Sequence, residues 1–206
     1  CVHEQLRVGM RLDISSPRNH FPLHEEAKHS VLIAGGIGIT PIWCMAQRLK
    51  ALNASFELIA LARSRDHAAL VEDVRALDIP VTWHFDDEHG GVPNLVSLLG
   101  RRSPDAGTHH YACGPAVMLE AFEAACRELG HAHVHLECFT AKPVEAAADA
   151  RQQFTVELRQ SGITFEVMPD ETLHQRLLDL GIGVPFSCEQ GLCGSCQTPV
   201  LELSLI

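Results

Sequence analysis

Long apolar runs are missing from this chain. No uninterrupted hydrophobic stretch approaches the length needed to cross a membrane, although 46% of the 206 residues are hydrophobic. The first ten residues, CVHEQLRVGM, also lack the charged and then apolar layout of a secretory signal. We therefore expect a soluble, cytoplasmic protein with a buried core and no membrane partner. Its length suits one large domain or two ordinary ones.

Basic residues are scarce as well. Lys and Arg total 16 against 26 Asp and Glu, which gives a formal net charge of −10. The imbalance is steepest in residues 145–206, where nine acidic residues stand against three arginines. Because binding to nucleic-acid phosphates needs a basic face, we expect no nucleic-acid partner. Two interpretations of the acidic segment stay open, docking on a basic partner surface and plain solvation.

No disulfide framework is expected among the eight cysteines, since the sequence has no secretory signal. Three of them, Cys188, Cys193 and Cys196, form a C-x4-C-x2-C run that contains Gly191 and Gly194. Zinc sites favour paired C-x2-C units or added histidines, and thioredoxin-like exchange favours an isolated C-x-x-C on a βαβ unit. The run instead follows the plant-type [2Fe–2S] pattern, in which glycines let backbone N–H groups point at the sulfurs.

The fourth thiolate of that pattern is absent, because no cysteine follows Cys196. The plant-type pattern places it roughly thirty residues further on. The chain also begins without Met. We therefore expect a piece of a longer protein, truncated at both ends.

Short apolar strands alternate with amphipathic helices through the first two thirds of the chain. This alternation predicts an α/β fold, with a parallel sheet covered by helices on both faces. The expected strands are 31–35, 56–62, 81–85, 109–113 and 133–139, and the expected helices are 41–52, 66–77 and 116–129.

The composition changes after residue 140. Residues 141–152 are rich in alanine and charge and read as a linker. Beyond them, 154–167 predicts a hairpin, and 171–181 predicts a helix that ends at Gly181, a suitable C′ residue. The expected domains are therefore an α/β domain at 27–140 and a smaller α+β domain at 153–206.

Residues 6–23 resemble one strand of an antiparallel domain with its connection. A barrel cannot be built from so few residues, so we assign 1–26 to the end of a domain that is otherwise missing. This strand is expected either to pair with an absent neighbour or to lie against the α/β domain.

Two glycine turns follow strands of the α/β domain. The first, AGGIGITPI, offers Gly35, Gly36 and Gly38 for close backbone approach, with Thr40 as the expected N-cap and Pro41 as the first helical residue. A helix N-terminus that opens onto a glycine-lined surface suits a pyrophosphate. The spacing departs from G-x-G-x-x-G, since Pro41 stands where the third glycine would be.

The second turn, YACGPAVM, repeats this design with Cys113, Gly114 and Pro115. Because ligands of open α/β sheets bind beyond the carboxyl ends of the strands, two such turns at one crevice strengthen the prediction of a nucleotide site. A third turn, LARSRD, carries the polar side chains of Arg63, Ser64 and Arg65. They suit either an adenosine ribose or its phosphate, or a solvated charged turn.

With these motifs in order, the chain resembles the family of phthalate dioxygenase reductase and vanillate O-demethylase reductase. The resemblance rests on six segments that cover nearly the whole chain: PRNHFPL, LIAGGIGITPI, LARSRD, YACGP, HLECF and CEQGLCGSC. It implies a ferredoxin-NADP-reductase-type domain, a C-terminal ferredoxin-like (β-grasp) domain and a flavin barrel. Of that barrel this sequence holds only the last strand.

The resemblance also implies roles for single residues. Glu137 and Phe139 would lie near the flavin edge, and the two glycine turns would border the nicotinamide and the pyrophosphate. Cys188, Cys193 and Cys196 would ligate the [2Fe–2S] cluster. No side chain would act as acid or base.

The implied activity passes electrons from NADH through FMN to the cluster and on to a Rieske-type aromatic-ring oxygenase or demethylase. Without a flavin domain, we expect this chain alone to be inactive. NADPH stays an alternative to NADH, because Arg63 and Arg65 also suit a 2′-phosphate. The alternative of another class is a non-enzymatic adaptor, with a nucleotide-binding domain joined to a zinc or ferredoxin-like module.

Overall fold

A computed structural model describes residues 2–14, 16–100, 106–139 and 152–203. Its larger part, which we call the α/β body (residues 27–139), is built on a five-stranded parallel sheet in the order β3-β2-β1-β4-β5. The strands are β1 (His29–Gly35), β2 (Phe56–Ala62), β3 (Val81–Phe85), β4 (Thr108–Cys113) and β5 (His133–Glu137). The α/β fold predicted from the alternation of strands and helices is confirmed.

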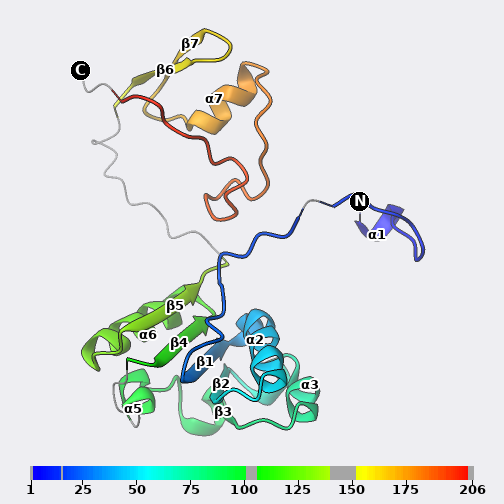
Figure 1. The fold of residues 1–206 in the computed structure, drawn as a ribbon, viewed down its shortest axis with the longest axis vertical. Helices are drawn as coiled ribbons and strands as arrows, with labels where there is room; N and C mark the ends of the chain where they lie inside the picture. Colours follow the sequence, from blue (N-terminus) through cyan, green and yellow to red (C-terminus); the bar gives the residue numbers. More distant parts are fainter. Residues whose placement is uncertain (1, 15, 101–105, 140–151, 204–206) are drawn as a thin grey trace.

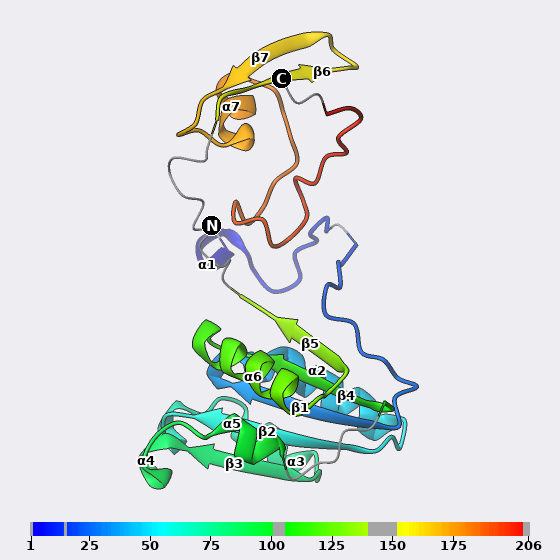
Figure 2. The same ribbon diagram turned by 90° about the vertical axis from the view of Figure 1, so that its left-hand side faces the viewer.

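Helices cover both faces of this sheet (Figures 1 and 2). On one face, α2 (Ile39–Ala51) and α3 (Val71–Ala76) enclose an apolar cluster that includes Leu32, Ile42 and Tyr111. On the other face, α5 (Leu95–Leu99) and α6 (Ala116–Glu128) enclose a second cluster around Ile33, Ile59 and Phe122. The central strands are buried on both faces, which explains their near-continuous apolar sequences. A short helix, α4 (Asp86–His89), and two single 3₁₀ turns, η1 (Gly36–Gly38) and η2 (Arg65–His67), complete the body.

The strand order reverses between β1 and β4, which lie side by side at the centre of the sheet. The chain leaves β1 toward β2 and β3 on one side and leaves β4 toward β5 on the other. In open α/β sheets this switch point opens a crevice at the carboxyl ends of the two strands. Both predicted glycine turns follow those ends.

The smaller part, which we call the cysteine body (residues 152–203), lies apart from the sheet (Figure 1). It holds the antiparallel pair β6 (Phe154–Leu158) and β7 (Ile163–Val167), the helix α7 (Leu173–Asp179) and the cysteine loop. Gly181 has a φ of +69°, and its N–H donates to Leu178 O at 2.9 Å while Ile182 N–H donates to Leu177 O at 2.9 Å. This Schellman motif confirms Gly181 as the C′ residue.

Several predicted boundaries were wrong, and three of them bear on the sites. Helix α2 begins at Ile39 with Gly38 as its N-cap, so Thr40 lies inside the helix, where its hydroxyl donates to Ile37 O at 3.0 Å. The helix expected at 66–77 is shorter, because Leu70 adopts a left-handed φ of +56° and α3 starts at Val71. The strand expected at 133–139 ends at Glu137.

The N-terminal segment forms one short helix, α1 (Val2–Gln5), and the described residues between it and β1 contain no strand. A strand needs a neighbour for its N–H and C=O groups, and none of the described residues offers one here. Phe21 instead packs on the α/β body. The assignment of 1–26 to a flavin barrel stays a prediction. None of the described helices is both long and apolar enough to span a membrane.

Candidate nucleotide crevice and iron–sulfur loop

The two glycine turns are packed directly against each other. A β-carbon on Gly38 would overlap the carbonyl of Cys113 and lie 2.7 Å from the amide nitrogen of Gly114. A β-carbon on Gly114 would lie 2.7 Å from the Met118 methyl and 3.1 Å from the Gly35 Cα. These glycines are therefore required by close backbone approach, as the sequence predicted, and they bring the ends of β1 and β4 together.

Two helices of 13 residues begin at this crevice, and neither has a side-chain cap. The N-cap of α2 is Gly38 and that of α6 is Pro115, and no side chain bonds to the first turn of either helix. The N–H of Ile39, the first residue of α2, donates to the carbonyls of Gly36 and Ile37, so η1 and α2 form one continuous helical start. The free N–H groups of a first turn carry the positive end of the helix dipole and attract an anion. Two such ends at one switch point form a surface that suits the two phosphates of a dinucleotide.

Cys113 ends β4 and is fully buried. Burial, and then the charges of Glu137 and Cys138, raises the pKa of its thiol to about 12. The thiol is therefore neutral near pH 7 and is a packing group rather than a nucleophile. Glu137 stands opposite Cys113 in the β4–β5 register, and Phe139, two residues on, is 48% exposed.

The third turn follows β2 and borders a cleft of ≈ 340 Å³ lined by Arg65, Trp83 and Phe85 among others. Arg65 forms two hydrogen bonds to the carboxylate of Glu88, at 2.5 and 3.0 Å, and its guanidinium lies 4.7 Å from the centre of the Phe85 ring. The bond from Arg65 also lowers the pKa of Glu88. Arg65 is thus paired with Glu88 and lines the cleft.

The other two polar residues of this turn differ from Arg65. The hydroxyl of Ser64 lies 2.8 Å from Nδ1 of His67, which closes the 3₁₀ turn η2. Arg63 is exposed. It is therefore the cation of this turn that is open to a ligand.

The cysteine loop is held by glycines and by bonds to sulfur. Gly191 and Gly194 have φ angles of +73° and +64°. The N–H groups of Gln190 and Cys193 both donate to Cys188 Sγ at 3.4 Å. The loop thus turns its backbone donors toward sulfur, as expected for a cluster that gains negative charge.

Hydrogen bonds within the loop make the thiol of Cys193 more acidic than an ordinary cysteine. Its Sγ lies 3.2 Å from Ser195 Oγ. The hydrogen bond with this hydroxyl, followed by backbone bonds at Ser195 and Cys188, lowers the pKa of Cys193 to about 6. A thiolate near neutral pH is the form that binds metal. The donor set therefore fits an iron–sulfur cluster, which Cys188, Cys193 and Cys196 are predicted to ligate.

Sequence reasoning missed two residues of these sites. Arg18 comes from the N-terminal segment and donates to Ser195 Oγ at 2.7 Å and to Cys193 O at 3.2 Å. Met118, in the first turn of α6, covers the glycines of both turns. Only the position of Arg18 in the PRNHFPL motif hinted at a role, and nothing in the local sequence marks Met118.

A nucleotide-type α/β body joined to a plant-type cysteine loop defines a class of electron-transfer proteins, and comparison with known proteins supports that class. Residues 156–205 match the 2Fe-2S iron-sulfur cluster binding domain. The chain is 45% identical to the vanillate O-demethylase oxidoreductase of Pseudomonas sp. (strain HR199 / DSM 7063) over 98% of its own length and 64% of that protein.

Two solved structures are similar to this chain. Phthalate dioxygenase reductase is 34% identical with a TM-score of 0.61, and the match covers 88% of this chain and 57% of that one. An intact type IV self-sufficient cytochrome P450 monooxygenase is 37% identical with a TM-score of 0.82 over 98% of this chain and 26% of its own. The chain is thus similar in sequence and in fold to phthalate dioxygenase reductase, and similar in sequence to the vanillate O-demethylase oxidoreductases. It spans 61% and 64% of the lengths of two curated relatives that are each 45% identical to it.

Proposed function

We propose that this chain forms the nicotinamide-binding and iron–sulfur parts of an oxidoreductase that passes electrons from NADH through FMN to a [2Fe–2S] cluster. The proposal is supported above all by one observation: two uncapped helix N-termini and two interlocked glycine turns share one crevice, in a chain that also holds the cysteine loop. When bound, the nicotinamide supplies a hydride, the flavin separates its two electrons, and the cluster carries them singly.

The residues of the chain would bind and orient rather than react. The N-termini of α2 and α6 would hold the pyrophosphate, and Cys113, Gly114 and Pro115 would border the nicotinamide. Glu137 and Phe139 would stand at the flavin edge. The exposure of the Phe139 side chain supports this role. Gly35, Gly36, Gly38, Thr40 and Pro41 would line the opposite wall. The neutral thiol of Cys113 adds no charge beside the ring.

We infer that the site prefers NADH to NADPH. The turn after β2 would receive the adenosine ribose, and its Arg65 is already neutralised by Glu88. A 2′-phosphate would meet the carboxylate of Glu88 beside Arg65, and within the described residues of this turn Arg63 is the arginine without a carboxylate partner. This repulsion discriminates by weakening the binding of NADPH rather than by strengthening the binding of NADH.

The final electron acceptor is proposed to be a Rieske-type aromatic-ring oxygenase or demethylase. The names of the relatives support an oxygenase system. A second candidate is a haem monooxygenase domain, which the likeness to a self-sufficient cytochrome P450 monooxygenase favours. The reading frame that encodes this segment separates them, because a haem domain encoded in the same frame would support the second candidate.

Calorimetry and metal analysis of the full chain test the core of the proposal. We expect NADH to bind, NADPH to bind more weakly, and iron with acid-labile sulfide to be present. With this chain alone, we expect no NADH-dependent reduction of an artificial acceptor. Absence of NADH binding at millimolar concentration would exclude the nucleotide site. A colourless protein whose cysteine loop holds zinc, lost in Cys193→Ser, would favour the adaptor.

A further inference from the structure

Histidines gather on one face of the sheet at its β4–β5 edge. In the register of these strands His109 stands opposite His133, and Tyr111 stands opposite His135. The rings of His109 and His135 are nearly parallel, with centroids 5.1 Å apart. This array lies outside the crevice and the cysteine loop, and neither uses it.

The segment that precedes β1 crosses this array and is fixed there by two contacts. Phe21 is buried, and its ring meets the edge of Tyr111 with centroids 5.8 Å apart. The N–H of His24 donates to the Tyr111 hydroxyl at 2.9 Å. These anchors place the imidazole of His24 over the two strands, although His24 itself is exposed.

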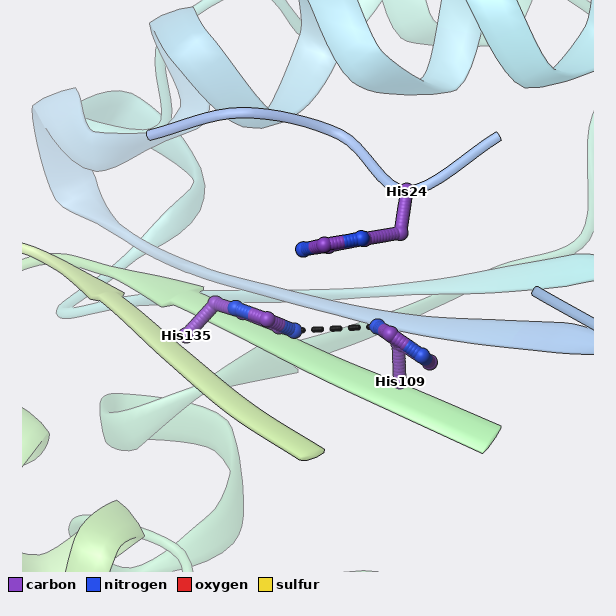
Figure 3. A group of neighbouring side chains, drawn as sticks. All are labelled: His24, His109 and His135. Atoms are coloured by element: carbon purple, nitrogen blue, oxygen red, sulfur yellow. Dashed lines mark hydrogen bonds between the residues drawn. The ribbon is translucent and has the colours of Figure 1, made fainter. Parts of the chain in front are cut away.

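Three imidazoles then converge. Figure 3 shows His24 lying over the hydrogen-bonded pair of His109 on β4 and His135 on β5. His109 Nδ1 and His135 Nε2 are 3.0 Å apart, and the ring of His24 is centred 4.8 and 4.9 Å from the other two rings. One ring nitrogen from each of the three histidines lies within 4.8 Å of the other two nitrogens. We call these residues the imidazole triad.

We propose that the imidazole triad is a binding site for a divalent cation of the zinc class. Neutral imidazoles are favoured ligands of Zn²⁺, Ni²⁺ and Cu²⁺. A Zn–N distance of about 2.0–2.1 Å in a tetrahedron sets the nitrogens about 3.3 Å apart. The two nitrogens of the His109–His135 pair need to separate by only a few tenths of an ångström, and both rings must turn so that their lone pairs point at the ion instead of at each other. His24 supplies the larger movement by turning its side chain, because its backbone N–H is held by the Tyr111 hydroxyl.

The three-histidine set leaves the fourth position of the ion to water. The proton now shared between His109 and His135 moves to the outer nitrogen of its ring, so both inner nitrogens offer lone pairs. No oxidation or bond cleavage is involved.

A metal ion at this site would tie the N-terminal segment to the sheet edge, because His24 would share the ion with His109 on β4 and His135 on β5. The cation would thereby fix the entry of the chain into the α/β body. His133 is a natural comparison, because it stacks on His109 at 4.3 Å but directs its Nε2 to Ala106 O at 3.0 Å. It is near the triad without being one of its ligands.

Zinc titration of the full chain, followed by imidazole NMR resonances, tests this site and separates it from the cysteine loop. We expect the resonances of His24, His109 and His135 to shift together and to saturate at one equivalent. His135→Asn and His24→Asn should each weaken zinc binding at these resonances by at least the ~10-fold typical of lost supporting groups. His133→Asn should leave the affinity within about twofold.

Other results would overturn the proposal. Zinc that shifts only resonances of the cysteine body, or no histidine at all, would show that the triad is a packing cluster. An equal loss of affinity in His133→Asn would show that stacking rather than ligation matters. Should His109→Asn or His135→Asn unfold, His24→Asn decides, because His24 lies on an exposed segment outside the sheet. NADH binding is expected to persist in His24→Asn, so the two proposals fail independently.

Discussion

The α/β body and the cysteine body are ordered by different means. In the α/β body, central residues such as Leu32, Ile33 and Ile59 are completely buried, and backbone packs on backbone at the glycine turns. In the cysteine body, the buried apolar residues are Phe165, Val167 and Leu177, and the cysteine loop has no regular structure in its described residues. The first site is prepared by packing, whereas we expect the second to depend on the cluster that it binds.

Removal of one cluster ligand is the sharpest way to test this contrast. We expect Cys193→Ser to lose the cluster and to loosen the cysteine body while the α/β body keeps its structure, because metal binding contributes folding energy. Iron and sulfide content, together with amide hydrogen exchange, measures both effects. Cys44→Ser, at an exposed and isolated cysteine, is the control. Equal loosening of both bodies would contradict the comparison.

Thiol reactivity in cluster-free protein should differ strongly between the bodies. Cys193, with a pKa of about 6, is mostly thiolate at pH 7, whereas Cys113, with a pKa of about 12, is not. Allowing for the lower nucleophilicity of acidic thiols, we expect iodoacetamide to modify Cys193 on the order of 100-fold faster. The rate at Cys193 should fall as the pH drops below 6. Mass spectrometry of peptides locates the modification, and comparable rates would refute the assignment.

A methyl group at the glycine turns should damage the prepared site. Gly38→Ala drives a β-carbon into the Cys113 carbonyl, which cannot move without separating β1 from β4. We expect a loss of about 3 kcal/mol in the free energy of unfolding and loss of NADH binding. Denaturant unfolding and calorimetry report these. Gly183→Ala adds a methyl where no atom lies within 4 Å, so NADH binding should be unchanged there.

The smallest expected effect comes from two matched helix caps, one in each body. Thr172 Oγ1 accepts from Gln175 N at 3.1 Å in the cysteine body, and Asn94 Oδ1 accepts from Ser97 N at 2.9 Å in the α/β body. Replacement of either by Ala should cost about 1 kcal/mol locally. We expect Thr172→Ala to speed cluster loss several-fold and Asn94→Ala to leave it unchanged. The rate of cluster loss is measured from the cluster absorbance over time. Equal rates in Thr172→Ala and Asn94→Ala would contradict the independence of the two bodies.

The sequence predicted the α/β body well because its signals are local. Buried parallel strands appear as apolar runs, amphipathic helices appear as periodic ones, and glycines mark the turns. The Gly35, Gly38 and Gly114 contacts confirm the expected close approach. Boundaries were less predictable. Thr40 has the right chemistry for an N-cap, but η1 continues into α2 and moves the cap to Gly38.

Features that join distant segments could not be predicted from local pattern. Arg18 reaches Ser195 across 177 positions of sequence, and the imidazole triad draws one residue from each of three segments. A single histidine in a strand carries no sign of its partners. The paired state of Arg65 was equally hidden, since Glu88 follows a different strand.

Met118 makes the crevice sensitive to oxidation. Its thioether rests against the places where Gly35 and Gly114 lack side chains, so an oxygen added to that sulfur has little room. Peroxide should convert it to the sulfoxide and force the two turns apart, and methionine sulfoxide reductase should restore coenzyme binding. A Met118→Leu variant should keep its NADH affinity through the same treatment. Oxidation of Met118 would thus be a reversible chemical change beside the proposed coenzyme site.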